Sequence, residues 1–181
     1  ATRVGVGIRD NRSDQAGGGL AAQESHMQMG RGQIQADTCP ADACHGGGSH
    51  LASTDGEIGQ VQVLDNECGP VDRGGGIYGI DSSPWLRQTT IARNVAGAMG
   101  GGLAMVGGAP LLEHVRIEGN VVSSGEMWGR GGGVHLVGSD AILENLVVVD
   151  NHAAYNGGGL YLHLSDPTLR NVSIAGNIGA Y

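Results

Sequence analysis

The sequence predicts an all-β fold, a right-handed single-stranded parallel β-helix (a solenoid) of about six to seven coils. The tripeptide Gly-Gly-Gly recurs along the chain, beginning at Gly17, Gly46, Gly74, Gly100, Gly131 and Gly157. Twenty positions after each first glycine stands an amide or carboxylate residue: Asp37, Asn66, Asn94, Asn120, Asn151 and Asn177. From that residue to the next tripeptide the distance varies from 6 to 11 positions. A constant segment followed by a variable one is typical of a solenoid with one permissive loop per coil.

Short strands are predicted inside the constant segment. The position seventeen after the first glycine is always aliphatic: Ile34, Val63, Ile91, Ile117, Val148 and Ile174. In most coils the residue two positions earlier is also apolar, and the residue between them varies, as in Gln62 and Arg116. Alternation with a period of two over β-branched residues indicates strands rather than helices. We therefore expect a single segment over 1–181, with coils starting near residues 17, 46, 74, 100, 131 and 157.

Stacked coils explain the repeated asparagines. An inward amide at a bend can bond to backbone groups there and to the asparagine one coil away, which satisfies polar groups that are costly to bury. We expect such a ladder at Asn66, Asn94, Asn120, Asn151 and Asn177. A second polar column, also expected to point inward, lies fourteen positions after the first glycine: Gln60, Gln88, His114, Asn145 and Asn171.

The composition excludes several partners. The net charge is −8, Lys is absent, and all ten basic residues are Arg. Nucleic acids and anionic membrane surfaces attract clusters of Lys and Arg, so neither is expected as a partner. No apolar run approaches the roughly 18 residues of a membrane-spanning helix, so we expect no membrane insertion by this segment.

The segment Gly157 to Asn177 resembles the repeats of bacterial right-handed parallel β-helix proteins, including those of the polymorphic outer-membrane-protein type. Those repeats combine a Gly-Gly-aliphatic element with a Phe-x-x-Asn element. Here the second element has an aliphatic residue in place of the aromatic, as in Ile174-x-x-Asn177, Val148-x-x-Asn151 and Ile8-x-x-Asn11. The resemblance implies the fold, and it implies a secreted or bacterial cell-surface protein. Such coils serve adhesins, passenger domains and carbohydrate-active enzymes alike.

Both ends of the sequence fall within a coil. Ile8 and Asn11 match the end of a coil, Tyr181 lies four positions past the ladder position of Asn177, and no capping segment is visible. Because solenoids normally carry caps, we expect either a fragment of a longer solenoid or end-to-end self-association between chains.

Three cysteines suggest a disulfide. Cys39 and Cys68 occupy the same repeat position, so they are expected to be neighbours in adjacent coils, whereas Cys39 and Cys44 share one loop. Either pair suits a secreted protein and leaves one thiol over. The alternative is a metal site formed by Cys39, Asp42, Cys44 and His45. The disulfide is favoured because a second pair of cysteines with matching spacing is missing.

Stacked carboxylates are a candidate site. Asp140 and Asp166 share one repeat position in adjacent coils, and Asp55 shares it further along. Such a pair could serve a retaining glycosidase or bind Ca²⁺. The favoured interpretation is a recurring Ser-Asp turn in which each side chain bonds to nearby backbone. We therefore predict no metal and no cofactor, with Ca²⁺ at these carboxylates as the alternative.

Two further groups are candidate ligand contacts. His135 and Tyr161 belong to one outward column with His50, Tyr78 and Ala104, where rings could stack on a sugar. The favoured alternative is ordinary strand residues facing solvent.

The longest loop, Val121 to Arg130, carries Trp128 and Arg130 near its end. These two residues suit a contact site, or Trp128 could fold back over its own coil.

The regular repeat favours a function in structure or adhesion. We expect an extracellular or cell-surface β-solenoid that presents loops for binding or assembly, with a polysaccharide or another surface protein as partner. The alternative is a carbohydrate-binding segment or a carbohydrate-active enzyme of the polysaccharide lyase or hydrolase kind. Enzymatic activity is left open, with no residue assigned as catalytic.

Overall fold

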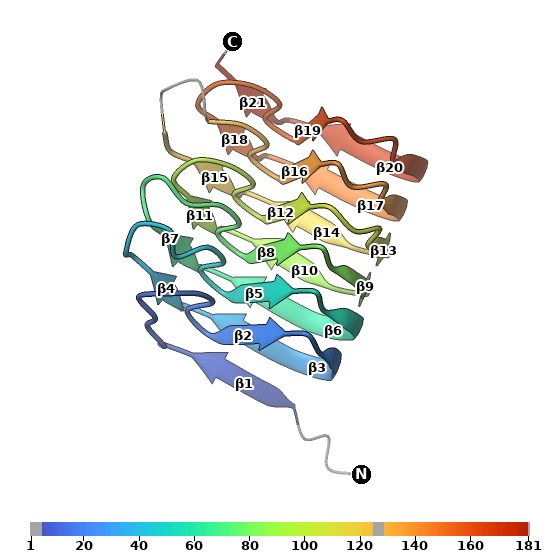
Figure 1. Ribbon diagram of the computed structural model, residues 1–181. Coiled ribbons are helices and arrows are strands. Elements are labelled where there is room, and N and C mark those ends of the chain that lie inside the picture. Colours follow the sequence, from blue (N-terminus) through green and yellow to red (C-terminus); the bar gives the residue numbers. More distant parts are fainter. Residues whose placement is uncertain (1–4, 125–128, 181) are drawn as a thin grey trace.

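The computed structural model describes residues 5–124 and 129–180, and these form a stack of coils whose strands lie in three parallel sheets (Figure 1). The first sheet contains β1 (Val6–Arg9), β3 (His26–Gln35), β6 (Asp55–Leu64), β9 (Ser83–Arg87), β10 (Thr90–Ala92), β13 (Leu111–Glu113), β14 (Arg116–Glu118), β17 (Ile142–Val149) and β20 (Thr168–Ala175). The second contains β4 (Thr38–Cys39), β7 (Glu67–Cys68), β11 (Val95–Ala96), β15 (Val121–Val122), β18 (His152–Ala153) and β21 (Ile178–Gly179). The third contains β2 (Leu20–Gln23), β5 (Ser49–Ala52), β8 (Ile77–Ile80), β12 (Leu103–Val106), β16 (Val134–Val137) and β19 (Leu160–His163).

Strand register follows the sequence repeat, so the predicted parallel β-helix is confirmed. The aliphatic residues seventeen positions after each first glycine pair directly with one another across the first sheet: Ile34, Val63, Ile91, Ile117, Val148 and Ile174. No helix occurs in the described part of the chain, and none of it could therefore cross a membrane as a long apolar helix.

The core is a set of stacked aliphatic columns inside the coil. Ile58, Leu86 and Leu112 come from the first sheet, and Leu51 and Leu136 from the third; all five are fully buried. Each inward residue touches its equivalents one coil above and below, which buries apolar surface at roughly 25 cal/mol per Å². The small-residue second sheet adds a separate buried cluster of Cys39, Cys44, Cys68, Ala96 and Val122.

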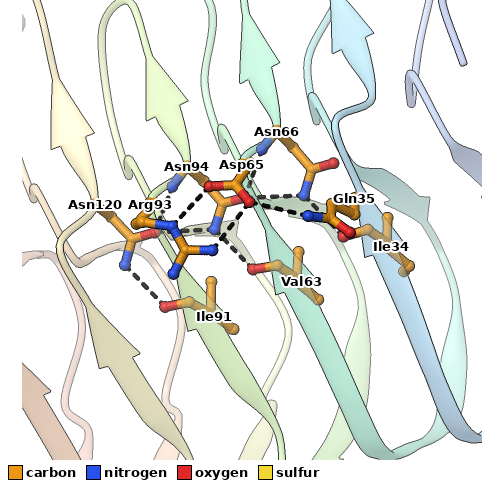
Figure 2. A network of polar contacts seen from close by, with 9 residues as sticks. All are labelled: Ile34, Gln35, Val63, Asp65, Asn66, Ile91, Arg93, Asn94 and Asn120. Carbon is orange, nitrogen blue, oxygen red and sulfur yellow. Dashed lines mark hydrogen bonds and ion pairs between the residues drawn. The ribbon is translucent and has the colours of Figure 1, made fainter. Parts of the chain in front are cut away.

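The asparagine ladder is present and continuous (Figure 2). The Asn94 side-chain amide donates to Asn120 Oδ1 at 2.9 Å and to the Val63 carbonyl at 3.0 Å. Its Oδ1 accepts from the backbone N and the Nδ2 of Asn66, at 3.0 and 2.9 Å. The pattern repeats through Asn120, Asn151 and Asn177. Each amide therefore links two coils while it satisfies buried backbone groups.

The second polar column points outward, so the prediction that it faces the core was wrong. Gln60, Gln88 and His114 are exposed, and Gln60 Nε2 donates to Gln88 Oε1 at 3.0 Å on the surface. The reason is backbone conformation: φ is +57° at Gln60, +50° at Gln88 and +53° at His114. A residue in the left-handed region turns the chain, which sends its side chain out at the corner.

Glycine at the second position of each tripeptide allows coils to approach closely. A Cβ added at Gly47 would lie 2.4 Å from the Gly75 carbonyl oxygen and 2.6 Å from the Glu67 carbonyl carbon. No side chain fits at such distances, because backbone from the next coil occupies the space. The tripeptide thus marks where the second and third sheets meet.

The last coil leaves its core side open. Leu162, Leu169 and Ile174 are 40%, 42% and 47% exposed, whereas Leu136, which pairs with Leu162 one coil earlier, is fully buried. These three side chains occupy core columns, so they form an apolar surface at the end of the stack.

Candidate functional site

An exposed face of the first sheet carries a row of side chains that alternate with the core residues. We call it the Trp85 face; its central column pairs Gln28, Glu57, Trp85, Leu111, Ile142 and Thr168. Because Leu86 and Leu112 point inward, their neighbours Trp85 and Leu111 must point out. Trp85 is 37% exposed and Ile142 is 41% exposed. An indole and two aliphatic side chains thus lie in line along the solenoid axis.

Charged neighbours hold the Trp85 ring in place. Arg87 lies over the indole, 5.4 Å from its centroid, and its Nη2 is 2.6 Å from Glu57 Oε1. On the other side the indole Nε1 donates to Glu113 Oε2 at 3.2 Å. A ring fixed on both sides loses little conformational freedom when a ligand stacks on it, which favours binding.

Two adjoining grooves border this face. One has a volume of about 400 Å³ and reaches Trp85; its walls are His26, Gln28, Asp55, Gly56, Glu57, Ser83 and Trp85. The second has a volume of about 500 Å³; its walls are Glu24, Ser25, Ser53, Thr54, Asp55, Asp81 and Ser83. They share Asp55 and Ser83, and His26 Nδ1 lies 2.6 Å from Asp55 Oδ1. The grooves therefore offer carboxylates and hydroxyls beside an exposed aromatic ring.

The column predicted to face solvent with His135 and Tyr161 is covered. His135 is 2% exposed and Tyr78 is 4% exposed, so the prediction of open strand residues was wrong for both. Their rings pack against other rings instead: His135 stacks on Tyr161 at 5.2 Å, and Tyr78 contacts His50 at 5.1 Å. The strands do point these residues away from the core, but residues directly before two glycine tripeptides pack against the column: His45 against Tyr78 and Arg130 over Tyr161.

Residues near the starts of the glycine tripeptides bring further polar side chains to the column. His45 lies 4.8 Å from the Tyr78 ring, and its Nδ1 is 3.1 Å from Oδ1 of the fully buried Asp72. Burial raises the pKa of Asp72, and the charge of His45 opposes this rise. Arg130 lies over the Tyr161 ring at 5.2 Å. The structure thus brings Arg130 to the column of His135 and Tyr161, although the sequence assigned it to a separate loop group.

Asp140 and Asp166 lie at a turn away from this column. Both are exposed, and Asp140 Oδ1 accepts a hydrogen bond of 3.0 Å from the Asp166 backbone N. This bond is of the kind expected for a turn ladder. No group of three or more His, Cys, Asp or Glu side chains placed to hold a metal ion occurs in the described ranges. The predicted contact residue Trp128 lies outside the described residues.

The cysteines form a disulfide within one loop. Cys39 and Cys44 are bonded, with their Cα atoms 5.4 Å apart, so the favoured disulfide is confirmed and the alternative, a metal site at Cys39, Asp42, Cys44 and His45, is wrong. Cys68 is free and buried, although it pairs in register with Cys39 across β4 and β7. The repeat correctly predicted that Cys39 and Cys68 are neighbours in adjacent coils, but the disulfide joins Cys39 to Cys44 within one loop.

Sequence reasoning missed the Trp85 face and the arginine neighbouring it. Trp85 stands between Pro84 and the inward Leu86, eleven positions after Gly74, in an outward column. The alternation of strand residues contained this signal, because a large aromatic side chain in an outward column stays exposed.

Comparison with models of known protein families gave no match, and none was found among curated proteins or among solved structures. The parallel β-solenoid therefore rests on the strand register and on the ladder. The likeness to polymorphic outer-membrane-protein repeats stays a resemblance of the repeat.

Proposed function

We propose that this chain is an extracellular β-solenoid that binds a linear, uncharged carbohydrate along the Trp85 face. The observation that carries the proposal is the exposed indole of Trp85, held between Arg87 and Glu113 beside two polar grooves. A pyranose ring has an apolar face that stacks on indole and hydroxyls at its edge that bond to carboxylates. Leu111 and Ile142 extend the apolar row, so a chain of sugars has more than one contact.

The charge of the Trp85 face indicates which class of carbohydrate it can bind. Carboxylates outnumber cations on this face and in its grooves: Arg87 and Arg170 stand against Glu24, Asp55, Glu57, Asp81, Glu113 and Glu144. An acidic polysaccharide would be repelled by this excess of carboxylates, whereas neutral hydroxyls can donate to them. A neutral glycan therefore fits best.

Binding is favoured over catalysis because the carboxylates nearest Trp85 already have partners. Glu57 pairs with Arg87, Glu113 accepts from the indole, and Asp55 contacts His26. A glycosidase would need two carboxyl groups that face the same sugar bond. The Cys39–Cys44 disulfide supports an oxidising compartment, in keeping with secretion.

A glycan array followed by calorimetry tests the proposal. We expect selective binding of a neutral linear oligosaccharide and a loss of roughly tenfold in affinity for Trp85→Ala, because an aromatic contact is worth about 1 kcal/mol or more. Trp85→Phe keeps a ring and should retain most of the affinity.

Val71→Ala is the matched control, since Val71 is an apolar side chain 60% exposed in a loop elsewhere. Equal binding by the wild type and Trp85→Ala would refute the proposal. Release of new reducing ends from a bound glycan would instead support the carbohydrate-active enzyme.

A further inference from the structure

Two half-buried arginines, Arg73 and Arg130, form no ion pair with any carboxylate of residues 5–124 and 129–180. Four other arginines in the same ranges do form such pairs: Arg12, Arg87, Arg93 and Arg116. Two more, Arg9 and Arg31, donate to glutamine side chains one coil away. Carboxylates are in excess in a chain with a net charge of −8. Because these two partly buried arginines have no carboxylate partner among the described residues, they are candidates for binding an anion from outside the chain.

The two arginines lie in one column along the solenoid axis. Backbone bridges join Arg73 to Met99 and Met99 to Arg130, so the two arginines are two coils, roughly 10 Å, apart. Partial burial leaves some of each side chain open to solvent. The column lies over the outer side of the third sheet, a different side of the coil from the Trp85 face.

Aromatic residues contact both guanidinium groups. Arg130 lies 5.2 Å from the Tyr161 ring and 6.0 Å from the Tyr155 ring, and its Nε is buried without a hydrogen-bond partner. Arg73 donates a side-chain hydrogen bond to the Tyr78 phenol; its charge and this bond lower the pKa of the phenol, against the larger raising effect of burial. A guanidinium group packed on rings is weakly hydrated, so an anion displaces little water when it binds.

His135 lies near both arginines and adds no charge. Burial, and then the charges of Arg73, Arg130 and His163, lower the pKa of His135 to about 4, so its ring is neutral at pH 7. Its Nδ1 is buried and has no hydrogen-bond partner. An anion between the arginines would offset their charge and raise the pKa of His135.

We propose that Arg73 and Arg130 bind an acidic glycan strand lying along the axis, through carboxylate or sulfate groups two coils apart. The length of two coils is similar to that of a disaccharide, so a glycan with one acidic group per disaccharide presents its charges at a matching interval. Arginine suits both groups because its planar fork can donate two parallel hydrogen bonds. This site is independent of the neutral-glycan site at the Trp85 face.

Calorimetry with three probes tests the site: an oligogalacturonate, a sulfated glycosaminoglycan fragment and a neutral oligoglucan of similar length. We expect binding of at least one acidic probe, weakened by added salt. Arg73→Gln and Arg130→Gln should each reduce the affinity roughly tenfold, the cost of one charge-assisted contact. In the wild type, the bound probe should raise the pKa of His135, followed by the NMR signal of its ring protons.

Arg170→Gln is the control, because Arg170 is exposed on β20 of the first sheet. Thermal melting shows whether each variant is folded. Two results overturn the proposal: an equal loss on Arg170→Gln, which indicates unspecific attraction, or acidic probes that leave the His135 pKa unchanged. Trp85→Ala should leave the affinity for the acidic probes unchanged, so the acidic-glycan site and the neutral-glycan site are tested independently. Binding of the oligogalacturonate would show that carboxylates suffice, because the glycosaminoglycan fragment carries carboxylates as well as sulfates.

Discussion

Replacing Asp37 by asparagine should stabilise the protein, because Asp37 is the carboxylate in a ladder of amides. Asp37 is fully buried; its Oδ1 accepts from the N and Nδ2 of Asn11 at 2.9 and 2.8 Å. Its Oδ2 has no hydrogen-bond partner. In Asn66, one coil on, the corresponding Nδ2 donates to the Ile34 carbonyl at 3.2 Å and to Asn94 Oδ1 at 2.9 Å.

The size of the effect follows from those two donations. The introduced amide would keep the acceptor used by Asn11 and gain two hydrogen bonds, one to the carbonyl of Ile8 and one to Asn66 Oδ1. At about 1 kcal/mol for each bond, the gain in unfolding free energy is about 2 kcal/mol at pH 7. For a chain of this length that corresponds to an increase in melting temperature of roughly 4–8 °C.

The gain should depend on pH. Burial raises the pKa of Asp37, and the hydrogen bonds from Asn11 only partly oppose it. A carboxyl whose folded pKa is raised contributes stability below its unfolded pKa and loses it as the pH rises through the folded pKa. As the pH rises through the folded pKa of Asp37, the wild type should therefore lose stability, whereas the asparagine variant should not. The difference in unfolding free energy between the two is then largest at pH 7 and smaller in acid.

Thermal unfolding followed by circular dichroism at pH 7 and at about pH 4 measures the difference. Asp65→Asn is the control, because Asp65 is exposed and Arg93 Nε lies 2.7 Å from its Oδ1, which lowers its pKa (Figure 2). That variant should gain nothing. A melting temperature of Asp37→Asn at or below that of the wild type at pH 7, or a gain equally large in acid, would contradict the reasoning.

Two other predictions concern the thiol and the open end. Burial raises the pKa of Cys68 to about 12, so we expect no alkylation by iodoacetamide at pH 8 in the folded protein and rapid alkylation in denaturant; labelling of native Cys68, read by mass spectrometry, would show the reasoning to be wrong. The exposed core side of the last coil should make the 181-residue chain self-associate end to end as its concentration rises. Sedimentation velocity should show this, with Ile174→Arg blocking association and the outward Ser173→Arg leaving it unchanged. A monomer at every concentration would count against it.

The sequence predicted the coil because each coil uses the same spacing. Twenty positions separate Gly74 from Asn94 and Gly100 from Asn120, and the same spacing aligns the two asparagines in space. These features could be predicted since they depend only on local period and on neighbouring coils.

What covers an outward residue could not be predicted from the repeat. His135 points away from the core as expected, yet it is buried, with its ring stacked on Tyr161 and the charge of Arg130 nearby, and the repeat period does not encode such neighbours. The Gln60 column was misassigned for another reason. Gln60 has a positive φ, and glutamine is not a residue type that predicts a left-handed backbone conformation.

The ladder gives the molecule a polarity. From Asn66 through Asn151, every asparagine-to-asparagine bond has its donor amide on the N-terminal side and its acceptor Oδ1 on the C-terminal side. Two identical ends brought face to face would oppose donor to donor or acceptor to acceptor. A symmetric dimer through the ends is therefore disfavoured. Subunits added at the ends would have to share one direction, as in an open filament rather than a closed ring or pair.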